Sequence, residues 1–219
     1  MSENTRTISP NKAKKSLTHA MKKKRPVFMW GPPGIGKSDI VAQVTNTFSN
    51  SHLIDIRLSL WDPTDIKGIP YFDSNIGKMV WGAPNELPDD EMANQYDNIV
   101  LFLDEMNSAP PAVQAAAYQL ILNRRVGQYK LPDNVIIVAA GNREGDKGVT
   151  YRMPAPLANR FVHIELTVEF NDWFDWAVDN KIHKDVVGYM QFSKKDLYDY
   201  NPRTSSRSFA TPRSWTFVS

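Results

Sequence analysis

Five short apolar runs, rich in Val, Ile, Leu and Phe, recur along this chain. They cover residues 26–30, 52–60, 98–105, 134–142 and 162–167. Most of them are continuously apolar and do not alternate with polar residues, which is typical of strands covered on both faces of a parallel sheet. The pattern therefore predicts five strands of one parallel sheet.

Apolar positions with helical spacing lie between these runs, most clearly at residues 37–49 and 111–125. Parallel strands need long crossover connections, which helices usually provide. The sequence thus predicts an α/β fold, a three-layer αβα sandwich with a parallel sheet, over about residues 1–168.

Two insertions and a helical tail complete the predicted organisation. Residues 68–84 suggest a hairpin around the turn DSNIG, and residues 126–134 suggest a shorter hairpin. Residues 169–219 contain helical patterns with no strand between them. We expect them to begin a small helical lid domain that is either truncated or unusually short.

Composition narrows the class of protein. The chain has 219 residues, 42% of them hydrophobic, a net charge of only +2 and no cysteine. Disulfides and thiolate zinc sites are therefore excluded. No apolar run approaches the roughly 20 residues of a membrane span, and the N-terminus does not resemble a secretory signal. We expect a cytoplasmic protein with no membrane contact.

The stretch GPPGIGKS, Gly31–Ser38, matches the phosphate-binding pattern G-x-x-x-x-G-K-[ST] in full. It follows a predicted strand and opens a predicted helix, so a chance Gly/Pro turn is a poor alternative. Lys37 would reach the β- and γ-phosphates and Ser38 would bind Mg²⁺. The residues expected to touch a nucleotide are Gly31, Pro32, Pro33, Gly34, Ile35, Gly36, Lys37, Ser38 and Asp39.

Two adjacent acids end the third apolar run. Asp104 is predicted to lie at the carboxyl end of a strand and to hold Mg²⁺, partly through water. Glu105 would polarise the water that attacks the γ-phosphate. A strand ending in an ordinary polar turn is the alternative, and the phosphate loop upstream disfavours it.

Three further polar residues are candidates with plainer alternatives. Asn142 ends the fourth run and could orient the attacking water, or simply form a turn. Arg160 precedes the last strand and could neutralise a transferring phosphoryl group. Arg213 begins a helix of the predicted lid. For both arginines a surface salt bridge is the alternative.

The order GPPGIGKS, LFLDE, AAGN, LANRF, TPRSW resembles that of an AAA+ ATPase. It is most similar to the MoxR branch (AAA-5 type), including small phage and bacterial forms. The stretches DPTDIKGIP, VWGAPNELP and DEMNSAPPAVQAAAYQLILNRRVG extend the resemblance. It covers essentially the whole chain from about residue 10.

The resemblance implies a P-loop NTPase fold with strand order 5-1-4-3-2, and ATP with Mg²⁺ as cofactors. It makes Lys37 and Ser38 the Walker A residues, Asp104 and Glu105 Walker B, and Asn142 sensor 1. Arg160 would be the arginine finger acting on a neighbouring subunit, although Arg143 and Arg152 lie near the same position. Arg213 would be sensor 2.

The implied assembly is a homo-oligomeric ring, usually a hexamer, that remodels a protein client. For the MoxR branch the client is expected to contain a von Willebrand factor A (VWA) domain. A nucleic-acid motor or loader and a nucleotide-gated scaffold with negligible turnover are the alternatives.

Basic residues gather near the N-terminus: Lys12, Lys14, Lys15, Lys22, Lys23, Lys24 and Arg25. They could contact nucleic acid or an acidic partner. The simpler interpretation is a solvated helix whose apolar side packs on the core. The aromatic residues around the first hairpin are Trp61, Tyr71, Phe72 and Trp81. At a hairpin tip they could grip a substrate or line a pore, but packing the hairpin onto its domain is the commoner role and the one expected here. Trp173, Phe174 and Trp176 are expected to fill the core of the lid.

Overall fold

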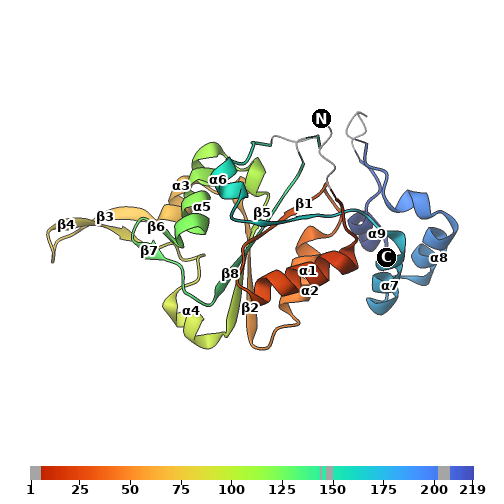
Figure 1. The fold of residues 1–219 in the computed structure, drawn as a ribbon, viewed down its shortest axis with the longest axis horizontal. Coiled ribbons are helices and arrows are strands. Elements are labelled where there is room, and N and C mark those ends of the chain that lie inside the picture. Colours follow the sequence, from red (N-terminus) through yellow and green to blue (C-terminus); the bar gives the residue numbers. More distant parts are fainter. Residues whose placement is uncertain (1–5, 144, 147–149, 202–207) are drawn as a thin grey trace.

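A five-stranded parallel sheet forms the centre of the computed structural model, which describes residues 6–143, 145–146, 150–201 and 208–219 (Figure 1). Its strands are β1 (Val27–Trp30), β2 (Ser51–Arg57), β5 (Asn98–Asp104), β8 (Val135–Gly141) and β9 (Val162–Glu165). They lie in the order β2-β5-β8-β1-β9 and every pairing is parallel. Counted along the chain this is the order 5-1-4-3-2, so the predicted fold class and strand order are confirmed.

Helices cover both faces of the sheet. Helices α1 (Pro10–Lys22) and α2 (Lys37–Thr45) lie together on one face, and α5 (Pro111–Asn123) lies on the other (Figure 1). In β5, Leu101 and Leu103 join the core beneath α5, while Val100 and Phe102 join the core beneath α1 and α2. This alternation, with apolar residues on both sides, explains why the strand sequences are continuously apolar.

The remaining helices of the core domain are short. They are α3 (Pro63–Lys67), α4 (Asp90–Gln95), α6 (Ala155–Ala158) and two 3₁₀ helices at Leu58–Leu60 and Met106–Ser108. The expected second strand, 52–60, in fact ends at Arg57, because the chain turns into the first of these 3₁₀ helices. The expected helix at 111–125 ends at Asn123, where Arg124 adopts a left-handed conformation with φ 52°.

Two hairpins interrupt the core, as predicted. The first pairs β3 (Ile69–Asp73) with β4 (Lys78–Gly82), and the second pairs β6 (Arg125–Val126) with β7 (Tyr129–Lys130). The first hairpin projects from the body of the molecule (Figure 1).

The packing expected for the aromatic residues of the first hairpin is wrong for most of them. Tyr71 and Phe72 are 53% and 62% exposed, and Trp81 is exposed as well. Only Trp61, which precedes the hairpin, packs against the core. The reason is geometric: a two-stranded ribbon that leaves the sheet has no layer to cover either of its faces.

The C-terminal helices form a small cluster with its own core. They are α7 (Phe170–Asp179), α8 (Lys184–Phe192), a 3₁₀ helix (Lys194–Leu197) and α9 (Pro212–Val218). Trp173 is buried in this core, and Phe174 and Trp176 pack against it, as predicted. The backbone N–H of Asn11, near the start of α1, donates to the Asp172 carboxylate at 2.7 Å and ties this cluster to α1.

None of the helices in the described part of the chain is both long and apolar enough to cross a membrane.

Candidate active site

Four of the polar residues singled out from the sequence meet at the carboxyl ends of the strands. Strands β1, β5 and β8 are parallel and adjacent, so their carboxyl ends lie side by side. Lys37 and Ser38 follow β1, Asp104 ends β5 and Asn142 follows β8. Hydrogen bonds join Lys37 to Asn142 and Ser38 to Asp104, at 3.3 and 3.1 Å. Residues more than 60 positions apart in the sequence therefore form one site.

The loop Gly31–Gly36 connects β1 directly to α2. Gly34 and Gly36 have φ of 77° and 88°, a region that favours glycine. The turn they allow leads into the N-terminus of α2, where backbone N–H groups and the helix dipole favour an anion. The structure thus has a glycine-rich loop that opens a helix in the place where the motif predicted it.

Lys37 is held inside this loop. Its ammonium group donates to the carbonyl oxygens of Gly31 at 2.7 Å and Pro32 at 3.0 Å, as well as to Asn142. The side chain is buried, and burial lowers the Lys37 pKa to about 8 although nearby Asp104 raises it. A buried cation is costly, so an anionic ligand at this position would be strongly favoured.

Ser38 and Asp104 supply oxygen atoms suited to Mg²⁺. The Ser38 hydroxyl donates to Oδ2 of Asp104, and Oδ1 of Asp104 accepts from the backbone N–H of Glu105 at 2.8 Å. Mg²⁺ is usually bound by one or two protein oxygens together with phosphates and water. Among the described residues no group of three or more Asp, Glu or His side chains could hold a metal. The donor set thus fits Mg²⁺ that arrives with a phosphate ligand.

Glu105 is engaged by two residues that follow or end β2. The Ser59 hydroxyl donates to its carboxylate, and Arg57 Nε lies 3.7 Å from its Oε1. The backbone at Glu105 is left-handed, with φ 54°, which is uncommon for a residue with a side chain and frequent at functional sites. The Glu105 carboxylate is thus held by Arg57 at the end of β2 and by Ser59 just after it, a relationship that the sequence did not predict.

Asn142 is positioned by Asn107, which sequence reasoning missed. Asn107 is only 2% exposed; its side-chain amide donates to the Asn142 carbonyl at 2.7 Å and its Oδ1 accepts from the Asn142 N–H at 3.1 Å. A methyl group on Gly141 would lie 2.2 Å from Asn107 Oδ1. In the sequence, the feature that could have pointed to Asn107 is its position three residues after Asp104, in the stretch DEMNSAP.

The three arginines considered for the finger differ in their surroundings. Arg143 pairs with Glu165 at 2.9 Å and donates to the carbonyl oxygen of Leu166 at 2.9 Å, so its guanidinium is used within the subunit. Arg160 and Arg152 are both exposed, and Arg160 follows α6 immediately before β9. Exposure does not separate Arg160 from Arg152, whereas Arg143 is engaged within its own chain.

Helix α9 rests on the phosphate loop. The backbone N–H of Arg213 lies 3.4 Å from the Gly34 carbonyl oxygen, and a methyl group on Gly34 would approach Thr211 to 2.7 Å. Nearby Arg213 is one of the charges that lower the Lys37 pKa. Arg213 thus lies close to the phosphate loop.

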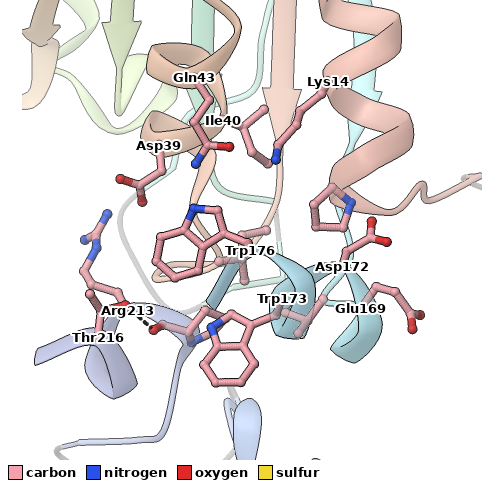
Figure 2. A pocket seen from close by; sticks show the side chains of 15 residues that line it. Lys14, Asp39, Ile40, Gln43, Glu169, Asp172, Trp173, Trp176, Arg213 and Thr216 are labelled. Carbon is pink, nitrogen blue, oxygen red and sulfur yellow. Dashed lines mark hydrogen bonds between the residues drawn. The ribbon is translucent and has the colours of Figure 1, made fainter. Parts of the chain in front are cut away.

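A pocket opens beside the phosphate loop between α2 and the C-terminal helices (Figure 2). Ile35, Asp39 and Ile40 line one side of it, and Trp173 and Trp176 of α7 line the other. Figure 2 shows the Trp176 ring facing Asp39, with Arg213 at the side. Apolar and aromatic residues make up about half of this lining, and charged residues such as Lys14, Asp39 and Asp172 share it. Small-molecule sites commonly combine apolar surface with a few polar groups.

The four remaining residues of the predicted loop support this geometry. Pro32 provides a carbonyl to Lys37, Pro33 is half-buried, and Gly31 donates its N–H to the Gly141 carbonyl at 3.3 Å. Ile35 is buried in the core that α1 and α2 form with the sheet.

Comparison with known proteins agrees with this geometry. Residues 27–167 match the family model for the ATPase family associated with various cellular activities (AAA). The chain is 24% identical over 200 residues to midasin from Giardia intestinalis, covering 83% of this chain and 4% of midasin. It is also 24% identical over 202 residues to a proteasome-associated ATPase from Pseudarthrobacter chlorophenolicus, covering 84% of this chain and 32% of the relative.

Solved structures share the fold. A crystal structure assigned as an ATPase, from Cytophaga hutchinsonii, superposes with a TM-score of 0.52 at 16% identity, over 97% of this chain and 57% of that chain. NtrX from Brucella abortus superposes with a TM-score of 0.54 at 14% identity, over 97% of this chain and 50% of that chain. The chain spans less than two thirds of the length of each of these relatives.

Proposed function

Because this chain belongs to the family of ATPases associated with various cellular activities, we propose that it binds ATP with Mg²⁺ and hydrolyses it to ADP and phosphate. The observation that carries the proposal is the meeting of Lys37, Ser38, Asp104 and Asn142 at the carboxyl ends of three adjacent strands. A phosphate loop, a carboxylate and an amide in this arrangement are the parts that nucleotide hydrolysis needs.

The triphosphate would lie along the loop Gly31–Gly36. There Lys37 would exchange its contacts with the Gly31 and Pro32 carbonyls for phosphate oxygens. Ser38 and Asp104 would hold Mg²⁺, which when bound neutralises charge on the β- and γ-phosphates. The adenine base would enter the pocket between α2 and α7, where Ile40 and Trp176 offer apolar surface.

Glu105 would act as the base that activates the attacking water, with Asn142 orienting that water. The Ser59 and Arg57 contacts compete for the Glu105 carboxylate. Hydrolysis would therefore require the carboxylate to leave these neighbours and turn toward the nucleotide.

A neighbouring subunit would complete the site. Arg160 is exposed at the surface, and we propose that it reaches the γ-phosphate bound by the adjacent subunit of a ring, most simply a hexamer. Arg213 would sense the nucleotide from the lid, because α9 rests directly on the phosphate loop. Lid movement would then link hydrolysis to work on a partner.

We propose that the work is done on a protein client in the cytoplasm. The sequence motifs of the MoxR branch favour a client with a VWA domain, and one relative is described as associated with the proteasome. The projecting hairpin β3–β4 exposes Ile69, Phe72 and Met79, and apolar surface of this kind is suited to gripping a protein chain.

Two substitutions test the proposal. Glu105→Gln should keep Mg²⁺-ATP binding and lose at least about 100-fold in turnover, since general base catalysis contributes about this much or more. Asp104→Asn should instead weaken Mg²⁺-dependent nucleotide binding. The measurement is steady-state ATP hydrolysis alongside binding of a fluorescent ATP analogue with and without Mg²⁺. Wild-type protein with no ATPase activity, or two variants with the same defect, would contradict the assignment.

A further inference from the structure

Helix α1 presents a basic face to solvent. Lys12, Lys15, His19, Lys22 and Lys23 are all exposed, and at helical spacing they lie along one side of α1. The opposite side is occupied by the buried residues Ala13, Leu17, Ala20 and Met21. The sequence between Pro10 and Lys22 contains no acid, so this face has no internal counter-charge.

Hollows run along both flanks of α1. The first lies between α1 and the edge strand β9, where Lys15, His19, Lys23 and Arg25 contribute basic groups. The second lies between α1 and α2, where Lys14, Lys15, His19 and Lys22 do so. Of the described residues that line the two hollows, none is an Asp or Glu. Helix α1 therefore stands between two hollows, and basic side chains line both of them.

Most of these charges are not neutralised by the protein itself. The ion pairs found among the described residues involve Arg57, Arg143 and His183, and none involves a residue of α1. Lys24 differs, since it donates to the Asp133 carbonyl at 3.1 Å. Lys14 also differs, because it borders the pocket that contains Asp39 and Asp172. Lys12 lines neither hollow. The lysines and the arginine that remain, Lys15, Lys22, Lys23 and Arg25, are called the basic ridge.

We propose that the basic ridge binds the phosphate backbone of duplex DNA without sequence preference. Phosphates repeat along both strands, and neutralising them with Lys and Arg supplies most of the non-specific affinity for DNA. The major groove of B-DNA admits a helix, whereas the major groove of A-form RNA is deep and narrow. With α1 facing a groove of the duplex, the basic groups on its two flanks would face the phosphates of the two strands that border that groove.

Other polyanions fit this surface less well. Single strands are usually gripped by aromatic side chains that stack on the bases, and the exposed face of α1 carries none. A helix that binds a lipid surface firmly inserts its apolar face, but Leu17 and Met21 are buried against the core. This surface is separate from the nucleotide site, so the inference does not depend on ATP hydrolysis.

The test is fluorescence anisotropy of a labelled DNA duplex with the whole chain over a series of salt concentrations. Wild-type protein should bind, with log affinity falling by about 0.9 per log unit of salt for each phosphate contacted. The variant Lys15→Gln/Lys22→Gln/Lys23→Gln should lose at least about tenfold in affinity at low salt and show a shallower slope.

The matched control is Lys130→Gln/Lys181→Gln/Lys184→Gln, which removes the same charge from exposed lysines outside the ridge. It should bind DNA within about twofold of wild type, and both variants should keep wild-type circular dichroism. Equal loss in the control, no loss in the ridge variant, or no duplex binding by the wild type would each overturn the proposal. So would equal or tighter binding of single-stranded DNA, duplex RNA, polyglutamate or phosphatidylserine vesicles.

Discussion

Asn107 and Asn142 are clamped together by two reciprocal hydrogen bonds. The Asn107 amide donates to the Asn142 carbonyl at 2.7 Å, and the Asn142 N–H donates to the Asn107 side-chain oxygen at 3.1 Å. The clamp fixes the backbone at the point where the Asn142 side chain turns toward Lys37. An amide buried within the core thus determines where a polar group of the site points.

Removing this clamp should impair hydrolysis more than nucleotide binding. In Asn107→Ala the Asn142 backbone groups lose their partners, which should cost about 1–3 kcal/mol of unfolding free energy. With Asn142 no longer fixed, kcat should fall about tenfold or more while the Kd for ATP changes little. Thermal unfolding and steady-state kinetics measure the two effects. Asn94→Ala, at an exposed position of α4, is the control and should change neither; a normal kcat in Asn107→Ala would remove the positioning role.

The lowered pKa of Lys37 predicts how pH acts on the free protein. The pKa is about 8 in the folded chain, whereas the ordinary pKa of a lysine is 10.5. As pH rises, the folded protein therefore loses this proton before the unfolded chain does. Below about pH 8 the amine is charged in both states, so its burial lowers the free energy of unfolding by the full amount. This lowering shrinks as pH rises toward 10.5, and the fold gains stability.

Nucleotide binding should raise the pKa of Lys37 and so restore its proton. Phosphate oxygens favour the charged amine, so ATP binding at about pH 9 should take up a proton and should weaken as pH rises further. Calorimetry in two buffers with different ionisation enthalpies measures the uptake. Lys37→Arg is the control, because a guanidinium stays charged over this range. Wild-type protein that binds ATP at this pH without proton uptake would contradict the prediction.

Gly34→Ala and Gly77→Ala form a matched pair. Both glycines have positive φ, 77° and 64°. A methyl group on Gly34 would lie 2.7 Å from Thr211, whereas one on Gly77 would meet nothing within 4 Å. Gly77→Ala should therefore cost only about 1 kcal/mol of backbone strain.

Gly34→Ala should cause the same backbone strain and, in addition, a clash between the new methyl group and Thr211. The clash should displace α9 and weaken ATP binding at least about tenfold. Denaturant unfolding and ATP titration of both variants make the comparison. Equal behaviour of the two variants would mean that contact between α9 and the phosphate loop does not support nucleotide binding.

Arg160 can be tested by mixing subunits. Arg160→Ala and Glu105→Gln should each be nearly inactive alone. If Arg160 acts on a neighbour, a mixed ring contains some sites with an intact Glu105 and an Arg160 from the next subunit, so activity should partly return. Arg152→Ala is the control and should keep most of its activity. Mixtures that stay inactive, although the subunits exchange, would argue that Arg160 acts within its own chain or not at all.

The fold was predictable because the main signals are local. Most strands of the sheet are continuous apolar runs, and the loop Gly31–Ser38 marks a strand-to-helix junction in a few letters. Acids at the end of β5 and an amide after β8 then follow from where parallel strands end. These residues are found in contact because the sheet brings those ends together.

The missed features depend on contacts between distant segments. Ser59 reaches Glu105 across 46 positions, and Asn107 reaches Asn142 across 35. Neither residue has a local signature: Ser59 lies in an apolar run that continues the pattern of β2, and Asn107 resembles an ordinary turn residue. The packing of the aromatic residues on the β3–β4 hairpin was not predictable for a related reason, since sequence alone does not show that the hairpin leaves the body of the molecule.

The strand order also dictates when the site can form during synthesis. Strand β1 lies between β8 and β9, so residues 27–30 have no complete set of neighbours until residue 165 has left the ribosome. At roughly 5–20 residues per second, this interval lasts on the order of ten seconds. Until β8 is made the apolar residues of β1 have no partner in the sheet, and until β9 is made one side of β1 stays unpaired. Chaperones that shield hydrophobic segments would therefore act before the nascent chain can hold a nucleotide.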